Sequence, residues 1–199
     1  MGPGDDRDGT AIGPDHAGHM SRVRFATIRA LSESFPEALQ NIDAEPTEEH
    51  PIAFLKKLMG QKKFEHAVSV CAYVLPRREA VWWGCVSARR LLAENLLINA
   101  APLLTAEAWV REPSEENRRA ALDIGTVADR NAPLTWLAMA AGWSSGTFVP
   151  TPIPVPAYMT ARAVRVALLM SARTLDASEY PRRLQSCMME GIRLAETGL

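Results

Sequence analysis

The amino-acid sequence predicts an all-α fold, either an irregular bundle or a short solenoid of helical hairpins. Apolar residues recur at three- and four-residue spacing from Arg22 onward, which is the period of an amphipathic helix. Sustained alternation of apolar and polar residues, the period of a strand, is nearly absent. With 199 residues, of which 47% are hydrophobic, the chain is long enough to bury a large core. We therefore expect residues 21–199 to form a single all-helical domain.

The first half of this domain predicts several helices in close succession. An amphipathic run ends at Pro36, and Thr47 is the expected cap of a second helix that ends at Gly60. Phe64–Val74 has helical spacing throughout, and Pro76 opens the next helix as a first-turn proline. We expect these last two helices to pack together as a hairpin.

A second hairpin is predicted around Pro113. Ala106–Val110 has a helical pattern, and Ser114 is placed to cap a following helix whose apolar face runs to Val127. The offset between the two hairpins lies within the range of helical-repeat periods, which is the argument for a solenoid. A stable array usually needs three or more units, so the same residues also fit an irregular bundle.

Two long helices are expected at the C-terminal end. Thr160 is the predicted cap of a helix over Ala161–Thr174. Pro181 lies in the first turn of a helix that runs to Glu196, before Gly198.

The segment 144–157 predicts an extended arm rather than a helix. Its alternating prolines remove backbone donors and favour polyproline-like extension. The apolar side chains of Phe148, Ile153 and Val155 could dock on a partner protein at little entropic cost. The alternative is that the arm crosses the surface of its own domain and buries these side chains there.

Residues 1–20 are expected to form a flexible tail. They contain almost no aliphatic side chain that could offset the entropy of ordering. Gly18–Ser21 fits a cloning junction, a native start at Met20 and a natural extension equally well. His16 and His19 stand three positions apart, but a mobile stretch does not preorganise metal ligands, so we expect no metal site.

Charge and cysteine content narrow the class of partner. The 22 basic and 23 acidic residues give a formal net charge of −1, so the chain as a whole does not attract nucleic acid. No apolar stretch is long enough to span a bilayer, and the three cysteines form no CxxC or Cys/His pattern. We expect a cytoplasmic protein with no nucleic-acid binding and no membrane insertion, and a homo-oligomer stays open.

The sequence carries no recognisable catalytic motif. Glycine-rich phosphate loops and the GxSxG and HExxH patterns are missing, and His50 and His66 have no nucleophile or ligand set beside them. Cys85, although near several arginines, fits a buried structural thiol better than a reactive one. We expect no catalytic residue and no cofactor. The alternative is an enzyme with a cleft between hairpins that uses Glu79 with Arg78, or Cys85.

A stretch rich in arginine and tryptophan is the best candidate for contact with a partner protein. Arginines flank Trp82 and Trp83, a composition typical of interface anchors. The two indoles point about 100° apart on a helix, so one should pack in the core and the other at its edge or in an interface. The predicted partner-binding residues of this stretch and of the arm are Arg77, Arg78, Trp82, Trp83, Arg89, Phe148, Ile153 and Val155.

Paired arginines also stand near two predicted helix starts, where positive charge is unfavourable. They are Arg118 with Arg119, and Arg182 with Arg183. We expect them to pair with Glu115 and Glu179, or to contact a partner.

Several segments resemble a family of uncharacterised bacterial proteins. These are Leu75–Cys85 (LPRREAVWWGC), Ala106–Val110 followed by Pro113, Thr135–Ala138 with Ala141–Trp143, and Thr160–Val164. The resemblance covers most of Arg22–Glu196 and implies an accessory protein encoded beside type VI secretion systems, with the Trp82-Trp83 stretch as its signature. It carries no known activity. We therefore expect a non-catalytic helical adaptor or chaperone-like protein that holds another protein, with a purely structural oligomer as a third option.

Overall fold

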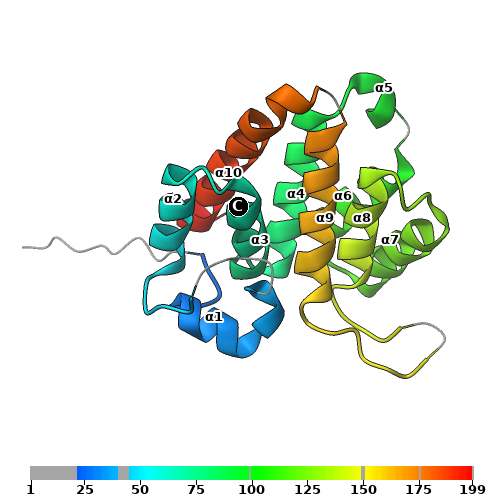
Figure 1. Cartoon of the computed structure of the whole chain (residues 1–199). Helices are drawn as coiled ribbons and strands as arrows, with labels where there is room; N and C mark the ends of the chain where they lie inside the picture. The colour runs from blue at the N-terminus through cyan, green and yellow to red at the C-terminus, as the bar shows by residue number, and fades with distance from the viewer. Residues whose placement is uncertain (1–21, 40–44, 99, 149–150, 175, 199) are drawn as a thin grey trace, which may run out of the picture.

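The computed structural model describes residues 22–39, 45–98, 100–148, 151–174 and 176–198. Within these ranges the chain is almost entirely helical, and its one β-type pairing is a single bridge between Thr147 and Pro154. Figure 1 shows the helices stacked in a bundle from which the segment between α8 and α9 projects. The all-α prediction is confirmed, whereas the tail predicted for residues 1–20 lies outside the described residues.

The helices occupy most of the described chain. They are α1 (Ile28–Ser34), α2 (Pro51–Gly60), α3 (Phe64–Val74), α4 (Arg77–Leu91), α5 (Glu94–Leu97), α6 (Ala101–Arg111), α7 (Glu115–Val127), α8 (Pro133–Gly142), α9 (Met159–Arg173) and α10 (Tyr180–Thr197). Two short 3-10 helices, η1 (Pro36–Ala38) and η2 (Ala177–Glu179), precede longer connections or helices.

Several helix ends lie where the local sequence predicts them. The range of α3 matches the prediction, and Ser114 caps α7 by accepting a hydrogen bond from the Asn117 backbone N–H at 3.2 Å. Pro181 lies in the first turn of α10, and Gly198 ends that helix with a φ of 78°. A proline needs no hydrogen-bonded N–H in a first turn, and glycine accepts a positive φ without strain.

The two threonine caps predicted for α2 and α9 are wrong. The N-cap of α2 is His50, whose ring nitrogen accepts from the Ile52 N–H, because the segment holding Thr47 is instead paired with α1 through its backbone carbonyls. Thr160 lies inside α9, where its buried hydroxyl donates to the Ala140 carbonyl of α8 at 3.1 Å. Both threonines therefore take part in contacts between helices rather than in local caps.

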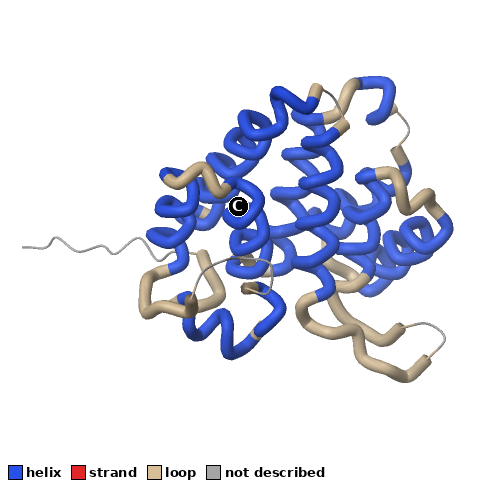
Figure 2. Tube along the Cα trace, in the orientation of Figure 1, coloured by secondary structure: helices blue, strands red, loops and turns tan. Residues whose placement is uncertain are grey.

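Helices α4 and α9 lie at the centre of the bundle. Helix α9 packs against α3, α4, α8 and α10, and α4 packs against α6, α8, α9 and α10. The expected hairpin of α3 with α4 does not form as a tight pair, since these two helices touch only slightly and each packs more extensively on α9. In a solenoid each unit contacts only its neighbours in sequence. The arrangement is therefore an irregular bundle (Figures 1 and 2).

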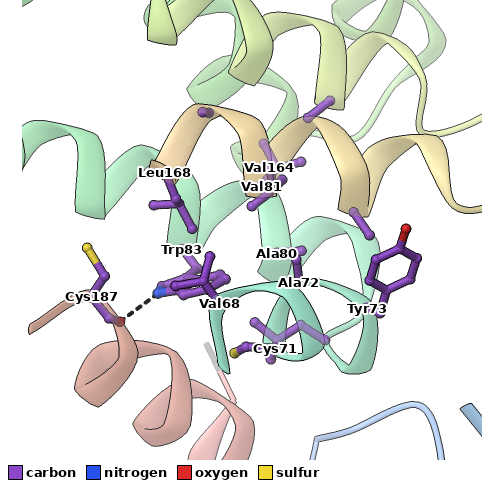
Figure 3. Close-up of a cluster of buried hydrophobic side chains, with 14 of the residues drawn as sticks. Val68, Cys71, Ala72, Tyr73, Ala80, Val81, Trp83, Val164, Leu168 and Cys187 are labelled. Carbon is purple, nitrogen blue, oxygen red and sulfur yellow. Dashed lines mark hydrogen bonds between the residues drawn. The ribbon is translucent and has the colours of Figure 1, made fainter. Parts of the chain in front are cut away.

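The core is centred on the indole of Trp83, which is fully buried. Its Nε1–H donates to the Cys187 carbonyl of α10 at 2.9 Å (Figure 3). Figure 3 shows buried side chains of two other helices around it, namely Val68 and Cys71 of α3 and Leu168 of α9, and Gly191 of α10 also faces the ring. One aromatic residue thus joins helices that are far apart in sequence.

Two glycines permit helices to approach closely. A Cβ added at Gly142, the last residue of α8, would lie 2.7 Å from the Leu122 Cα of α7. A Cβ at Gly191 would lie 2.9 Å from both the Cys71 sulfur and the Trp83 ring. Backbone and rigid ring atoms cannot make way for these extra atoms without a shift of whole helices.

No helix in the described part of the chain combines the length and the apolar character that a bilayer crossing requires.

Replacing Gly142 with alanine should destabilise the fold, because α7 and α8 must separate to admit the methyl group. We expect a loss of about 1–3 kcal/mol in the free energy of unfolding, measured by urea denaturation. Gly60 is the matched control, since it also ends its helix but has nothing within 4 Å of an added Cβ. Gly60→Ala should be neutral or stabilising by up to about 1 kcal/mol. Equal losses in the two variants would contradict this account of the α7–α8 contact.

Candidate functional site

The two tryptophans of the Leu75–Cys85 stretch divide as their spacing predicts. Trp83 lies in the core, while Trp82 is partly buried and packs against the core from its edge. The prediction that Trp83 anchors a partner protein is therefore wrong, because no part of its side chain reaches the surface. The helix turns Trp83 inward because α10 supplies a carbonyl acceptor and a glycine opposite it.

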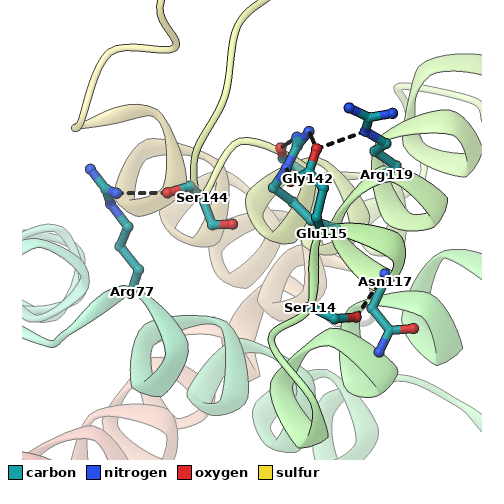
Figure 4. Close-up of polar contacts among 8 residues, drawn as sticks. Arg77, Ser114, Glu115, Asn117, Arg119, Gly142 and Ser144 are labelled. Atoms are coloured by element: carbon teal, nitrogen blue, oxygen red, sulfur yellow. Dashed lines mark hydrogen bonds and ion pairs between the residues drawn. The ribbon is translucent and has the colours of Figure 1, made fainter.

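Arg77 and Arg78 bind the carboxyl ends of other helices rather than standing free. The Arg78 Nε–H donates to the Val110 carbonyl of α6 at 2.6 Å, and Arg77 donates to the Ser144 carbonyl just after α8 at 2.6 Å (Figure 4). The last carbonyls of a helix have no partner within it and form the negative end of its dipole, so guanidinium groups stabilise them. Both arginines thus make hydrogen bonds within the fold.

Arg118 forms a third contact of this kind and is only 5% exposed. It donates to the Gly142 carbonyl at 2.6 Å and forms two hydrogen bonds, of 2.7 and 2.8 Å, with the carboxylate of Glu115. Arg119 donates to the same carboxylate at 2.7 Å, as Figure 4 shows. The expected pairing of these arginines with Glu115 is confirmed, and so is that of Arg182 with Glu179. Arg183 instead donates to the Ala172 and Leu91 carbonyls, at 3.2 and 3.1 Å. The hydrogen bonds from Arg118 and Arg119 lower the pKa of Glu115 to about 2.

These arginines surround a polar cavity of about 370 Å³, which we call the arginine pocket. Its lining residues are Arg77, Arg78, Trp109, Pro113, Ser114, Glu115, Arg118, Ser144 and Ser145. It lies where α4 and α7 begin and where α6 and α8 end. Its arginines are bound to carbonyls or to Glu115, and these bonds join four helix ends.

Arg89 lies further along α4 and does not reach this pocket. Its guanidinium makes a two-point ion pair with Glu107 of α6, at 2.5 and 2.7 Å. Arg89, which was predicted to bind a partner, thus forms a partly exposed ion pair between α4 and α6.

The segment predicted as an extended arm folds back on itself. The Phe148 N–H donates to the Ile153 carbonyl at 2.9 Å, and the Val155 N–H donates to the Gly146 carbonyl at 2.9 Å. Gly146 has a φ of 84°, which a residue with a side chain rarely adopts. Figure 2 shows the resulting loop projecting from the bundle. The described part of the arm contains no helix, and it is held by these two hydrogen bonds and the bridge between Thr147 and Pro154.

The three apolar residues of this arm differ in their surroundings. The Phe148 ring lies edge-on to the Trp143 ring, with centroids 6.4 Å apart, which matches the alternative in which the arm packs on its own domain. Ile153 is 58% exposed and Val155 is partly buried. The Phe148 contact thus agrees with packing of the arm on its own domain, and docking of the exposed Ile153 on a partner stays a prediction.

An apolar cavity of about 400 Å³ lies between α7, the end of α8 and the arm, and we call it the arm groove. It is lined by Leu122, Asp123, Thr126, Val127, Arg130, Met139, Trp143, Thr147 and Phe148. Val127 is 84% exposed at its rim, and Trp136 continues the aromatic row at 6.5 Å from Trp143. Helical spacing predicts Val127 on the apolar face of α7 but does not predict the groove, because it does not reveal where a neighbouring helix ends.

The residues named for an enzymatic alternative do not converge. Cys85 is fully buried, and this burial raises the pKa of its thiol well above the usual range, which confirms a structural thiol. Glu79 is half-buried on α4, whereas the Arg78 guanidinium is bonded to the end of α6. Among the described residues, no three histidine, cysteine or acidic side chains form a metal-binding cluster.

Comparison with known proteins gives a family but no characterised relative. A model described as a family of unknown function (DUF6931) matches residues 54–195, which span α3 to α9 and most of α2 and α10. No curated protein and no solved structure matches the chain.

Trp83→Ala should cost about 3–5 kcal/mol in the free energy of unfolding, because it empties the centre of the core and leaves a buried carbonyl without its indole donor. Trp82→Ala, one residue away and partly exposed, should cost less than half as much. Urea denaturation of both variants measures the difference. A larger loss for Trp82→Ala would reverse the assignment of the two indoles.

Glu115→Gln should lower the melting temperature at pH 7 and leave it nearly unchanged near pH 2. The folded-state pKa of Glu115, about 2, lies below the value of about 4.3 expected for the unfolded chain. Ionised Glu115 therefore stabilises the fold above about pH 4.3, and this stabilisation is lost as the pH falls towards about 2.

The control for this pH series is Glu116→Gln, in the same first turn of α7 but with no ion pair to a described residue. Thermal melts from pH 2 to 7 should show a smaller and flatter difference for this variant. Parallel curves for the two variants would contradict the role of the Arg118 and Arg119 pairs.

Proposed function

This chain belongs to the family of unknown function DUF6931, and we propose that it is a non-catalytic protein-interaction module, an adaptor or chaperone-like accessory protein that holds a partner at the arm groove. We further propose that the partner is a component or an effector of a type VI secretion system and that the complex forms in the cytoplasm.

The arm groove is the observation that supports an interaction function. It places an exposed Val127, the Trp143 and Phe148 rings and the thioether of Met139 around one cavity. Exposed apolar surface with a polar rim is typical of binding sites, and aromatic residues and methionine are enriched in interfaces. The groove accepts a few apolar side chains of a partner, which would act as its anchor.

The rim of the groove favours an amphipathic partner segment. Asp123 and Arg130 give it one charge of each sign, and the arm supplies a second apolar contact through the exposed Ile153. A stable interface usually covers about 800 Å² on each partner, which exceeds one groove. The partner would therefore extend from the groove over the arm, and the partly buried Trp82 lies outside this surface.

The type VI secretion assignment rests on a resemblance of segments, above all Leu75–Cys85. Most conspicuous residues of that stretch act within the fold, since Trp83 fills the core while Arg77 and Arg78 bind helix ends. The stretch would then mark a shared scaffold, and the arm groove would carry the binding.

Exposed residues of matched chemistry allow a direct test. Val127→Glu and Ile153→Glu place a charge at the groove and on the arm, and Met189→Glu places the same charge on α10, where Met189 is 65% exposed. We expect all three to melt near the wild-type temperature, because surface substitutions change stability by only about 0.5 kcal/mol. The variants and the wild type are used as baits in a lysate of the native host, with quantitative mass spectrometry.

The proposal expects a protein captured in near-stoichiometric amount by the wild type and by Met189→Glu, and reduced about tenfold or more by Val127→Glu or Ile153→Glu. Undiminished capture by both groove variants would reject the arm groove. A captured protein unrelated to type VI secretion would reject only that assignment. Light scattering that finds a homo-oligomer dissolved by Val127→Glu would reassign the groove to self-association.

A further inference from the structure

A second cavity, of about 330 Å³, lies beside the start of α3 and the start of α10, and we call it the lysine pocket. Lys62, Lys63 and His66 line it from the α2–α3 turn and α3, and Tyr180 and Leu184 line it from α10. Helix α10 lies on the side of the molecule away from the arm (Figure 1). The pocket therefore shares no residue with the arm groove or the arginine pocket.

The two lysines carry positive charge that nothing nearby neutralises. The ammonium groups of Lys62 and Lys63 make no hydrogen bond or ion pair with any residue that the structure describes, although both backbone N–H groups are bonded within the turn. By contrast, Lys56 and Lys57 of α2 pair with Glu196 at 2.7 Å and Glu49 at 3.4 Å. The difference arises in the turn, where Lys62 has a φ of 57° and the Lys63 N–H is bound to the Leu58 carbonyl.

The acid within the pocket does not cancel this charge. Glu65 accepts a hydrogen bond from the Tyr180 hydroxyl at 2.7 Å and one from Arg173 at 3.2 Å. Its carboxylate is thus matched by a cation outside the pocket lining. The lining keeps an excess of positive charge from its two lysines.

Two further features of α3 favour an anion at this place. The N-cap residue Lys63 makes no side-chain hydrogen bond to the first turn, so the leading N–H groups of the helix are not capped by it. His66 also lines the pocket, and its Nδ1 is buried without a hydrogen-bond partner among the described residues. An unpaired buried polar atom is unfavourable.

We propose that the lysine pocket binds a small molecule that carries a phosphate group. Lys62, Lys63 and the first turn of α3 hold the phosphate, since ammonium groups and helix N-termini both favour this anion. Phe64, Tyr180 and Leu184 form an apolar wall for the rest of the molecule. The volume is at the lower end of the range for small-ligand sites, about 300–1,000 Å³. This binding is independent of the interaction function proposed for the arm groove.

Calorimetric titration with phenyl phosphate tests the proposal, with inorganic phosphate as the head group alone and vesicles containing phosphatidic acid as a lipid source. The key variant is Lys62→Gly with Lys63→Gln, because glycine suits the positive φ at position 62 and the fold should be kept. The control is Lys56→Gln with Lys57→Gln, which removes the same charge from paired lysines. Thermal melts verify that both variants are folded.

The proposal expects saturable binding of phenyl phosphate by the wild type. Binding should weaken about tenfold or more in the Lys62 and Lys63 variant and change less than about twofold in the control. If the vesicles bind with this same pattern while phenyl phosphate binds more weakly, the phosphate comes from a lipid head group. The proposal is overturned if none of the three probes binds. It is also overturned if both variants lose the same affinity, because that result would indicate only an effect of net charge.

Discussion

The placement of one indole determines which helices must meet in this protein. Trp83 lies where α3, α4 and α10 come together, and its hydrogen bond to the Cys187 carbonyl joins the middle of the chain to its last helix. Gly191 is needed opposite the ring, since a side chain there would collide with it and with Cys71. The bundle therefore cannot close around this residue until α10 has arrived, which makes its central contacts non-local.

The arginines connect this core to the surface where binding is proposed. Arg118 holds the Gly142 carbonyl and Arg77 holds the Ser144 carbonyl, so the backbone on both sides of Trp143 is fixed. The Trp143 ring in turn supports Phe148 of the arm. The arm thus begins from a rigid base, although it projects from the bundle. Arginines that the sequence suggests as interface anchors can therefore contribute to an interface indirectly, because they fix the backbone from which its residues project.

How far the sequence predicts this molecule depends on whether a feature is local. The ranges of α3 and α10 and the Ser114 cap follow from nearby residues and agree with the structure. Thr47 and Thr160 have equally good capping chemistry, but α1 and α8 supply competing contacts that local reasoning cannot weigh. Which of Trp82 and Trp83 packs in the core likewise depends on α10. Of the residues that line the arm groove, the sequence predicts Phe148 as a binding residue. It does not predict that Val127 is exposed there, because this depends on where α8 ends.

The fold protects the thiols of its three cysteines from reaction, and this property is separate from partner binding. Cys71, Cys85 and Cys187 are all buried, on α3, α4 and α10. Burial raises the pKa of each thiol, that of Cys187 to about 11. A thiol-alkylating reagent can reach them only when the surrounding helices separate. The alkylation rate of each cysteine would therefore measure how often the core opens at its own helix, and no label has to be introduced.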